Sequence, residues 1–81
     1  MKNISIYDNG GKTLDRITVI FDKEKRQTND GIIYNCVVAS ETGNGIYLHS
    51  EAMKGRHLGK KIDFSKLSLP LQNKLLIELN K

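Results

Sequence analysis

Short apolar runs separated by glycine-bearing polar turns most restrict what this chain can fold into. Two of the runs, RITVIFD at residues 16–22 and IIYNCVVAS at 32–40, are rich in the β-branched residues that favour strands. Two shorter runs, at residues 4–7 and 46–50, alternate apolar with polar residues, as half-buried strands do. Because the connections are short, the sequence predicts an antiparallel meander.

The connections carry their own signals. In the stretch YDNGGKTLDR, residues 7–16, Gly10 and Gly11 tolerate positive φ and predict a tight hairpin turn. Asp8 and Lys12 would then face each other across the turn as an exposed ion pair. Residues 22–31 predict a loop or a solvated extension of the second strand, and residues 41–45 a second glycine-rich turn.

The second half of the chain predicts the helical parts. Ser50 as N-cap and Gly55 as terminator would bound one helical turn, and a short edge strand is expected at residues 60–64. The tail from Ser68, with Pro70 in its first turn, predicts one amphipathic helix. Its apolar stripe, which would cover one face of the sheet, consists of Leu71, Leu75, Leu76 and Leu79.

These elements predict a small α+β fold. We expect an antiparallel sheet of three to five strands with one C-terminal amphipathic helix packed on it, in a single domain over residues 1–81. A chain of this size buries about 60% of its unfolded surface and is marginally stable. A partner or self-association, for example as a homodimer, would add stability.

Cysteine usage and hydropathy predict a cytoplasmic protein. The single cysteine, Cys36, excludes an internal disulfide and is interpreted as a small buried hydrophobe. The N-terminal residues lack the apolar core of a signal peptide. No apolar run approaches the ~20 residues that cross a bilayer, so we expect no membrane partner.

The net charge of +4 is concentrated in the second half of the chain. Residues 54–66, KGRHLGKKIDFSK, hold five Lys or Arg against one Asp. Such a patch favours an anionic partner, namely an acidic protein surface or a nucleic acid. The stretch is not a phosphate-binding loop of NTPases, because three rather than four residues separate Gly55 from Gly59 and Lys61 follows Lys60. No cofactor is expected.

Two interpretations of residues 7–16 remain open. The stretch is a solvated hairpin, or it is an anion nest in which the glycine amides, Lys12 and Arg16 are donors. A divalent metal on Asp8 and Asp15 would have too few ligands, and His49 with His57 makes a poor zinc site, so no metal is expected.

The tyrosines and histidines allow two further hypotheses. Tyr7, Tyr34 and Tyr47 fall on three predicted strands, where core packing is favoured over a stacking platform for bases. No nucleophile is placed beside either histidine, so no catalytic residue is assigned.

The two polar stretches resemble a group of small proteins from bacteria, phages and plasmids. These share a D-N-G-G-K-T-x-D-R-x-T-V opening, matched here by residues 8–19, and a G-x-H-x-G-x-x-I-x-F-x-x-L-P segment, matched by residues 55–70 except for an insertion before the proline. Ile17 stands where an aromatic residue is expected. The resemblance implies a bacterial or mobile-element origin and no particular activity, and it hints that the two stretches act together.

The predicted site is therefore one basic, glycine-lined surface made by both stretches. Its anion- or partner-binding residues are Lys12, Arg16, Arg56, His57, Lys60 and Lys61, and its turn glycines are Gly10, Gly11, Gly55 and Gly59. The favoured function is a small non-enzymatic binding or accessory protein. The alternatives are a nucleic-acid-binding module that uses the basic loop and the tyrosines, and a small hydrolase that uses His57 with Asp15.

Overall fold

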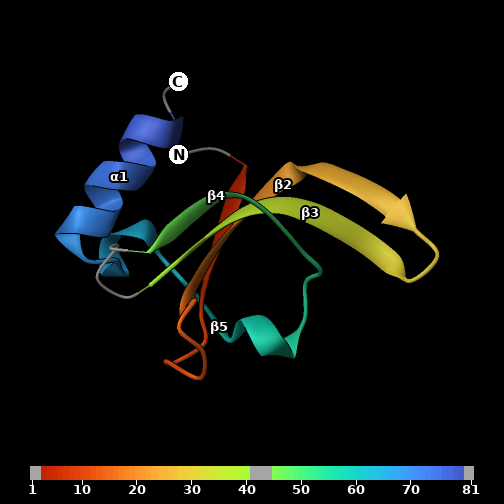
Figure 1. Ribbon diagram of the computed structural model, residues 1–81, viewed down its shortest axis with the longest axis horizontal. Helices are drawn as coiled ribbons and strands as arrows, with labels where there is room; N and C mark the ends of the chain where they lie inside the picture. The colour runs from red at the N-terminus through yellow and green to blue at the C-terminus, as the bar shows by residue number, and fades with distance from the viewer. Residues whose placement is uncertain (1–2, 41–44, 80–81) are drawn as a thin grey trace.

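The computed structural model, which describes residues 3–40 and 45–79, is a five-stranded antiparallel sheet with one C-terminal α-helix (Figure 1). The sheet order is β4-β3-β2-β1-β5. Its strands are β1 (Ile4–Asp8), β2 (Ile17–Thr28), β3 (Gly31–Ala39), β4 (Ile46–Ala52) and β5 (Lys60–Ile62). Two 3₁₀ turns, η1 (Arg56–Leu58) and η2 (Phe64–Lys66), flank β5, and the helix α1 spans Leu69–Leu79. The predicted α+β class is confirmed.

Strand β2 is much longer than its neighbour β1, so only its first part lies between two strands. Its pairing with β3 shifts register between Ile20 and Lys25, and beyond this irregularity the β2–β3 hairpin projects from the sheet as an arm (Figure 1). Residues 23–27 of this arm are charged or polar, and their side chains are exposed to solvent. Of the two structures expected for residues 22–31, the solvated strand extension is therefore the correct one for most of the stretch.

Helix α1 covers one face of the sheet, as its apolar stripe predicts. Leu71 and Leu75 are each 1% exposed, while Leu76 lies at the margin with 39% of its surface exposed. The side chain of Leu79 lies outside the described part of the chain. Beneath the helix, alternate residues of the strands and of the segment after η2 form the main core, namely Ile6, Ile17, Val19, Val37, Ala39 and Leu67.

The opposite face of the sheet has a smaller core, which the β4–β5 connection covers. The chain leaves β4 at one edge and enters β5 at the other, so residues 53–59 cross this second face. Leu58 of η1 packs there against Ile20, Tyr34 and Cys36. Cys36 is 1% exposed, and burial raises the pKa of its thiol. The interpretation of Cys36 as a buried hydrophobe is confirmed.

The helical turn expected between Ser50 and Gly55 is wrong. Ser50 and Ala52 continue β4, opposite Cys36 and Tyr34 of β3. Pairing with a neighbouring strand outweighs the weak local preference for a cap and a turn. The 3₁₀ turn η1 instead begins after Gly55. The glycine-rich turn expected at residues 41–45 falls mainly on residues 41–44, which lie outside the described residues.

Candidate functional site

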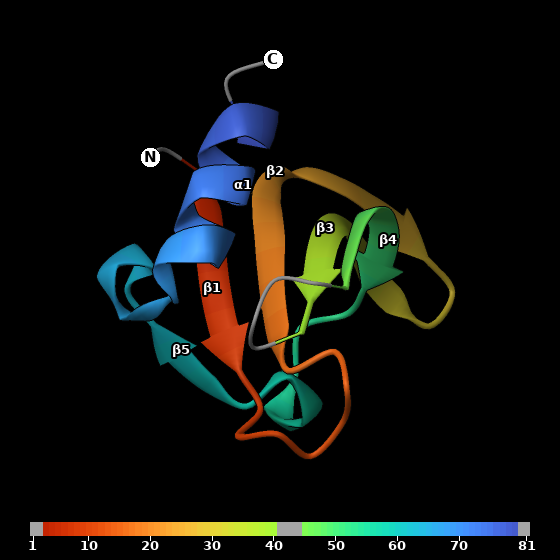
Figure 2. The same ribbon diagram turned by 60° about the vertical axis from the view of Figure 1, so that its left-hand side comes forward.

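The two polar stretches singled out in the sequence lie side by side (Figure 2). Strand β5 pairs with β1, with Lys60 opposite Asp8. Gly59, which precedes β5, is so close to the end of β1 that an added Cβ would lie 2.2 Å from the carbonyl oxygen of Asp8. Gly59 and Lys60 of the second stretch therefore lie against Asp8 and Asn9 of the first. We call the end of the sheet formed by loop 9–16 and residues 55–61 the cationic end. That it binds a partner stays a prediction.

The hairpin between β1 and β2 is wider than the tight two-glycine turn that was expected. The strands close at the Asp8–Ile17 pair and the N–H of Asn9 donates to the carbonyl of Arg16, which leaves loop 9–16 beyond them. Gly10 and Gly11 have φ of 77° and 86°, so the positive φ expected at these two positions is present.

The amides at the start of loop 9–16 are used within the loop. Gly10 N–H donates to Asp8 Oδ1 at 2.7 Å, and the amides of Gly11 and Lys12 both donate to Asn9 Oδ1, at 2.9 and 3.1 Å. Short side chains that accept from backbone amides two and three residues on are typical of Asp and Asn in turns. The anion nest built on glycine amides is therefore wrong, because these donors already have acceptors.

Arg16 is bound to Asp8. Its Nε and one terminal nitrogen donate to the two carboxylate oxygens, at 2.7 and 3.1 Å, in a bidentate pair. These hydrogen bonds, with that from Gly10 and the charge of Arg16, lower the pKa of Asp8 despite the opposing effect of burial. The expected Asp8–Lys12 pair is thus replaced by Asp8–Arg16. We assign Arg16 to holding the loop in place rather than to partner binding.

The remaining predicted binding residues are exposed. Lys12 lies in loop 9–16, Arg56 and His57 lie in η1, and Lys60 begins β5. Within residues 3–40 and 45–79, none of these four side chains forms an ion pair with a carboxylate. Lys61 is exposed too and lies opposite Tyr7, on the second face of the sheet that the connection with Arg56 and His57 crosses. Lys60, opposite Asp8, lies on the α1 face at the same end of the sheet.

Lys54 fastens the β4–β5 connection to the second face. Its ammonium lies 2.8 Å from Asp22 Oδ1 and 4.7 Å from the ring centroid of Tyr34. Asp22 Oδ1 accepts no well-aligned hydrogen bond from the described residues, so this ammonium compensates its charge. Asp22 Oδ2 accepts from the buried hydroxyl of Ser5 at 2.7 Å. Only the fold reveals this contact, because Asp22 and Lys54 are far apart in the sequence.

Two of the three tyrosines do not present a free ring. Tyr34 is 9% exposed beneath Lys54, and Tyr7 is partly buried against the same cluster. Tyr47, 60% exposed, lies on β4, at the other edge of the sheet from β5. Core packing is thus the correct interpretation for Tyr34, and the tyrosines do not form a shared platform beside the basic loop.

The hydrolase hypothesis has no geometric counterpart among the described residues. His57 and Asp15 are both exposed, and no hydrogen bond or ion pair joins their side chains there. The carbonyl of Asp15 accepts from the side chains of Asn9 and Thr13. In the same residues no three His, Cys, Asp or Glu side chains gather as a metal site, and no helix is long and apolar enough to cross a membrane.

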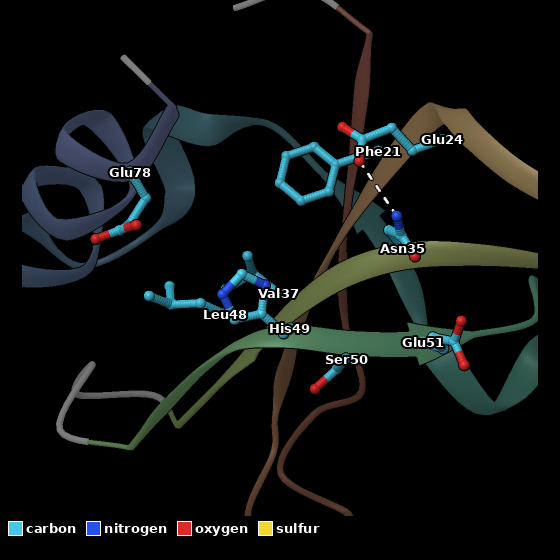
Figure 3. A pocket seen from close by; sticks show the side chains of 9 residues that line it. All are labelled: Phe21, Glu24, Asn35, Val37, Leu48, His49, Ser50, Glu51 and Glu78. Carbon is cyan, nitrogen blue, oxygen red and sulfur yellow. Dashed lines mark hydrogen bonds between the residues drawn. The ribbon is translucent and has the colours of Figure 1, made fainter. Parts of the chain in front are cut away.

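A groove on the α1 side of the sheet was missed by sequence reasoning (Figure 3). It has a volume of about 540 Å³, and its lining combines apolar side chains with three glutamates and neither Lys nor Arg. Arg26 binds Glu51 at 2.6 Å and Asn35 donates to Glu24 at 3.2 Å. The lining residues come from β2, β3, β4 and α1, so no local signal could have found it. They are Phe21, Glu24, Asn35, Val37, Leu48, His49, Ser50, Glu51 and Glu78.

Stability is expected to fall as the pH drops below about 4, because Asp8 and Asp22 stabilise the fold only as carboxylates. Burial raises the pKa of Asp22, but its contacts with Lys54 and Ser5 outweigh burial, so both aspartates have a pKa below the ordinary 3.8 in the folded state. Their stabilisation is complete above the unfolded-state pKa and is lost as the pH falls through the folded-state pKa. Urea unfolding at a series of pH values measures this.

The matched variants are Asp8→Asn, Asp22→Asn and, as a control, Asp30→Asn in the exposed β2–β3 turn. The first two should be less stable at pH 7 and should lose less stability on acidification than the native chain. Asp30→Asn should keep the native pH dependence. Equal pH dependence in all four proteins would contradict the assignment.

No protein-family model matches this chain, and no curated protein or solved structure matches it either.

Proposed function

We propose that this protein is a small binding protein that presents its cationic end to an anionic partner, an acidic protein surface or a nucleic acid. The observation that carries the proposal is the contact of Gly59 and Lys60 with Asp8 and Asn9, which brings the segments that carry Lys12 and Arg56 to the same end of the sheet. Cations left unpaired on one surface attract and orient an anionic partner more than they stabilise the fold.

Three features support binding rather than catalysis. The exposed side chains of Lys12, Arg56, His57 and Lys60 do not line the groove on the α1 side of the sheet. The thiol of Cys36 is buried with a raised pKa and is not available as a nucleophile. His57 has no hydrogen-bonded carboxylate among the described residues to orient it. General acid–base and nucleophilic catalysis both depend on such oriented groups.

Charge reversal on the cationic end is expected to weaken binding to a polyanion. We expect Lys12→Glu with Arg56→Glu to lower the affinity for labelled duplex DNA, single-stranded RNA or polyglutamate about tenfold or more, since two favourable contacts become repulsive. The matched control, Lys23→Glu with Lys25→Glu on the exposed β2–β3 arm, changes net charge equally. Fluorescence anisotropy at several salt concentrations measures the affinity.

The outcomes separate the partner classes. Affinity for DNA or RNA that falls steeply with salt in the native chain and is lost in the Lys12/Arg56 variant would favour the nucleic-acid module. Binding to polyglutamate alone would favour an acidic protein. If both double variants lose the same affinity, net charge rather than the cationic end is responsible, and the proposal fails.

A further inference from the structure

Leu14 is an apolar side chain held in solvent at the cationic end. It is 91% exposed, more than any other large hydrophobic residue that the structure describes. It lies in loop 9–16, two residues after Lys12, and the first residue of that loop, Asn9, lies against Gly59 of the segment that carries Arg56. Single exposed leucines are common on protein surfaces. Leu14 differs from such leucines because internal hydrogen bonds hold its loop in a fixed conformation.

Hydrogen bonds from within hold that loop in shape. Asn9 Nδ2 donates to Thr13 Oγ1 at 2.9 Å and to the carbonyl of Asp15 at 3.3 Å. Thr13 Oγ1 donates to the same carbonyl at 3.2 Å. These bonds bracket Leu14 on both sides, and Asn9 Oδ1 fixes the preceding glycine turn. A side chain presented on an ordered loop loses less conformational entropy on binding than one on a disordered loop.

The chemistry around Leu14 favours a protein over a nucleic acid. A surface that binds single-stranded nucleic acid combines cations with exposed aromatic rings on which bases stack. Here Tyr34 is buried, Tyr7 is partly buried, and Tyr47 lies at the far edge of the sheet. Protein interfaces instead place an apolar anchor at the centre and charged groups at the rim. Leu14, with Lys12 two residues before it in the same loop, has that composition.

We propose that Leu14 is the apolar anchor of a docking surface whose partner is an acidic protein segment with bulky apolar side chains. Leu14 packs between those apolar side chains, and Lys12, Arg56 and Lys60 meet the acidic residues around them. This inference rests on the proposed function and narrows it to one class of partner. The cations orient the partner, but salt screens exposed charges and so limits the affinity that they add. Burial of Leu14 supplies the remaining affinity.

The test selects random linear peptides on the immobilised native protein and measures the affinity of the enriched peptides for the native chain and its variants. The enriched peptides should combine Asp or Glu with large apolar residues. Leu14→Asp should lower their affinity about tenfold or more, as the loss of an apolar anchor does. Leu14→Met should keep it, because the anchor stays apolar and of similar size.

The matched control is Ile77→Asp, which changes a 63% exposed isoleucine in the last turn of α1, at the opposite end of the molecule from loop 9–16 (Figure 1). It adds the same charge and should leave peptide affinity within about twofold, and coincident urea unfolding curves verify that both variants fold. Peptides that bind Leu14→Asp as tightly as the native chain would overturn the inference. So would the absence of acidic peptides, or binding confined to DNA or RNA and unchanged by Leu14→Asp. If only the Lys12/Arg56 reversal weakens binding, the inference fails while the proposed function stands.

Discussion

Gly59→Ala is expected to lower the free energy of unfolding by about 3 kcal/mol or more, a large part of the stability of so small a domain. The new Cβ would lie 2.2 Å from the carbonyl oxygen of Asp8 and 2.5 Å from the Cα of Asn9. Both are backbone atoms at the end of β1, so relief requires β5 to separate from β1. Gly59 also has φ of 89°, a conformation that alanine adopts only with strain.

Gly10→Ala is the matched control for this prediction. Gly10 has φ of 77°, close to that of Gly59, but nothing lies within 4 Å of the position where its Cβ would be. The Gly10→Ala substitution should therefore lower the free energy of unfolding only by the cost of placing alanine at a positive φ, about 1 to 2 kcal/mol. Urea unfolding followed by circular dichroism measures both variants. If both variants lose the same free energy of unfolding, the close packing of Gly59 against Asp8 and Asn9 is not the reason that glycine is needed there.

The Gly59 variant also reports on the proposed function. Any Gly59→Ala protein that still folds must move β5, and with it η1, away from loop 9–16. Affinity for the polyanion should then fall even though every cation is retained. Gly10→Ala leaves the segments in contact and should keep more of the affinity. Unchanged affinity in a folded Gly59→Ala protein would show that binding does not need the juxtaposition.

Leu75→Ala is expected to cost about 3 kcal/mol, because the substitution leaves a cavity between α1 and the sheet. Leu75 is 1% exposed and belongs to the main core with Val19 and Val37. Its matched control, Ile77→Ala on the same helix, removes a side chain that is 63% exposed. That change should stay within about 0.5 kcal/mol.

The same unfolding measurement separates the two helix variants, and hydrogen exchange on the strands shows how far the effect spreads. Because the main core is shared by the helix and the sheet, loss of Leu75 should weaken protection in β1, β2 and β3 together. If the sheet of Leu75→Ala keeps its native protection while α1 frays, the helix is an appendage rather than part of the cooperative fold. Equal costs for Leu75→Ala and Ile77→Ala would contradict the orientation of α1.

Much of the fold could be predicted because its signals are local. Alternating and β-branched runs mark strands wherever they occur, and the spacing of Leu71 and Leu75 marks the buried side of a helix. The error at Ser50 to Gly55 has the same origin. A serine, a glycine and helix-tolerant residues between them suggest a turn locally, whereas pairing with β3 extends the strand there.

The candidate site was predictable only as a list of residues. Charge and glycine content identified loop 9–16 and residues 55–61, but not that Asp8 binds Arg16 instead of Lys12. Nor did composition distinguish Lys54, which is bound to Asp22, from Lys12, which is exposed. Which basic side chain reaches Asp8 or Asp22 depends on how the strands are paired. That pairing joins residues far apart in the sequence, so composition does not reveal it.

The amino-acid order alone thus determined most of each strand, the C-terminal helix and the positive φ at Gly10 and Gly11, since each follows from the conformational preferences and apolar spacing of neighbouring residues. Tertiary structure alone decided that β5 joins the free edge of β1, that Leu14 stands in solvent, and that Glu24, Glu51 and Glu78 share a groove. The physical reason is that these arrangements arise from pairing and burial between residues far apart in the chain, which no local preference specifies.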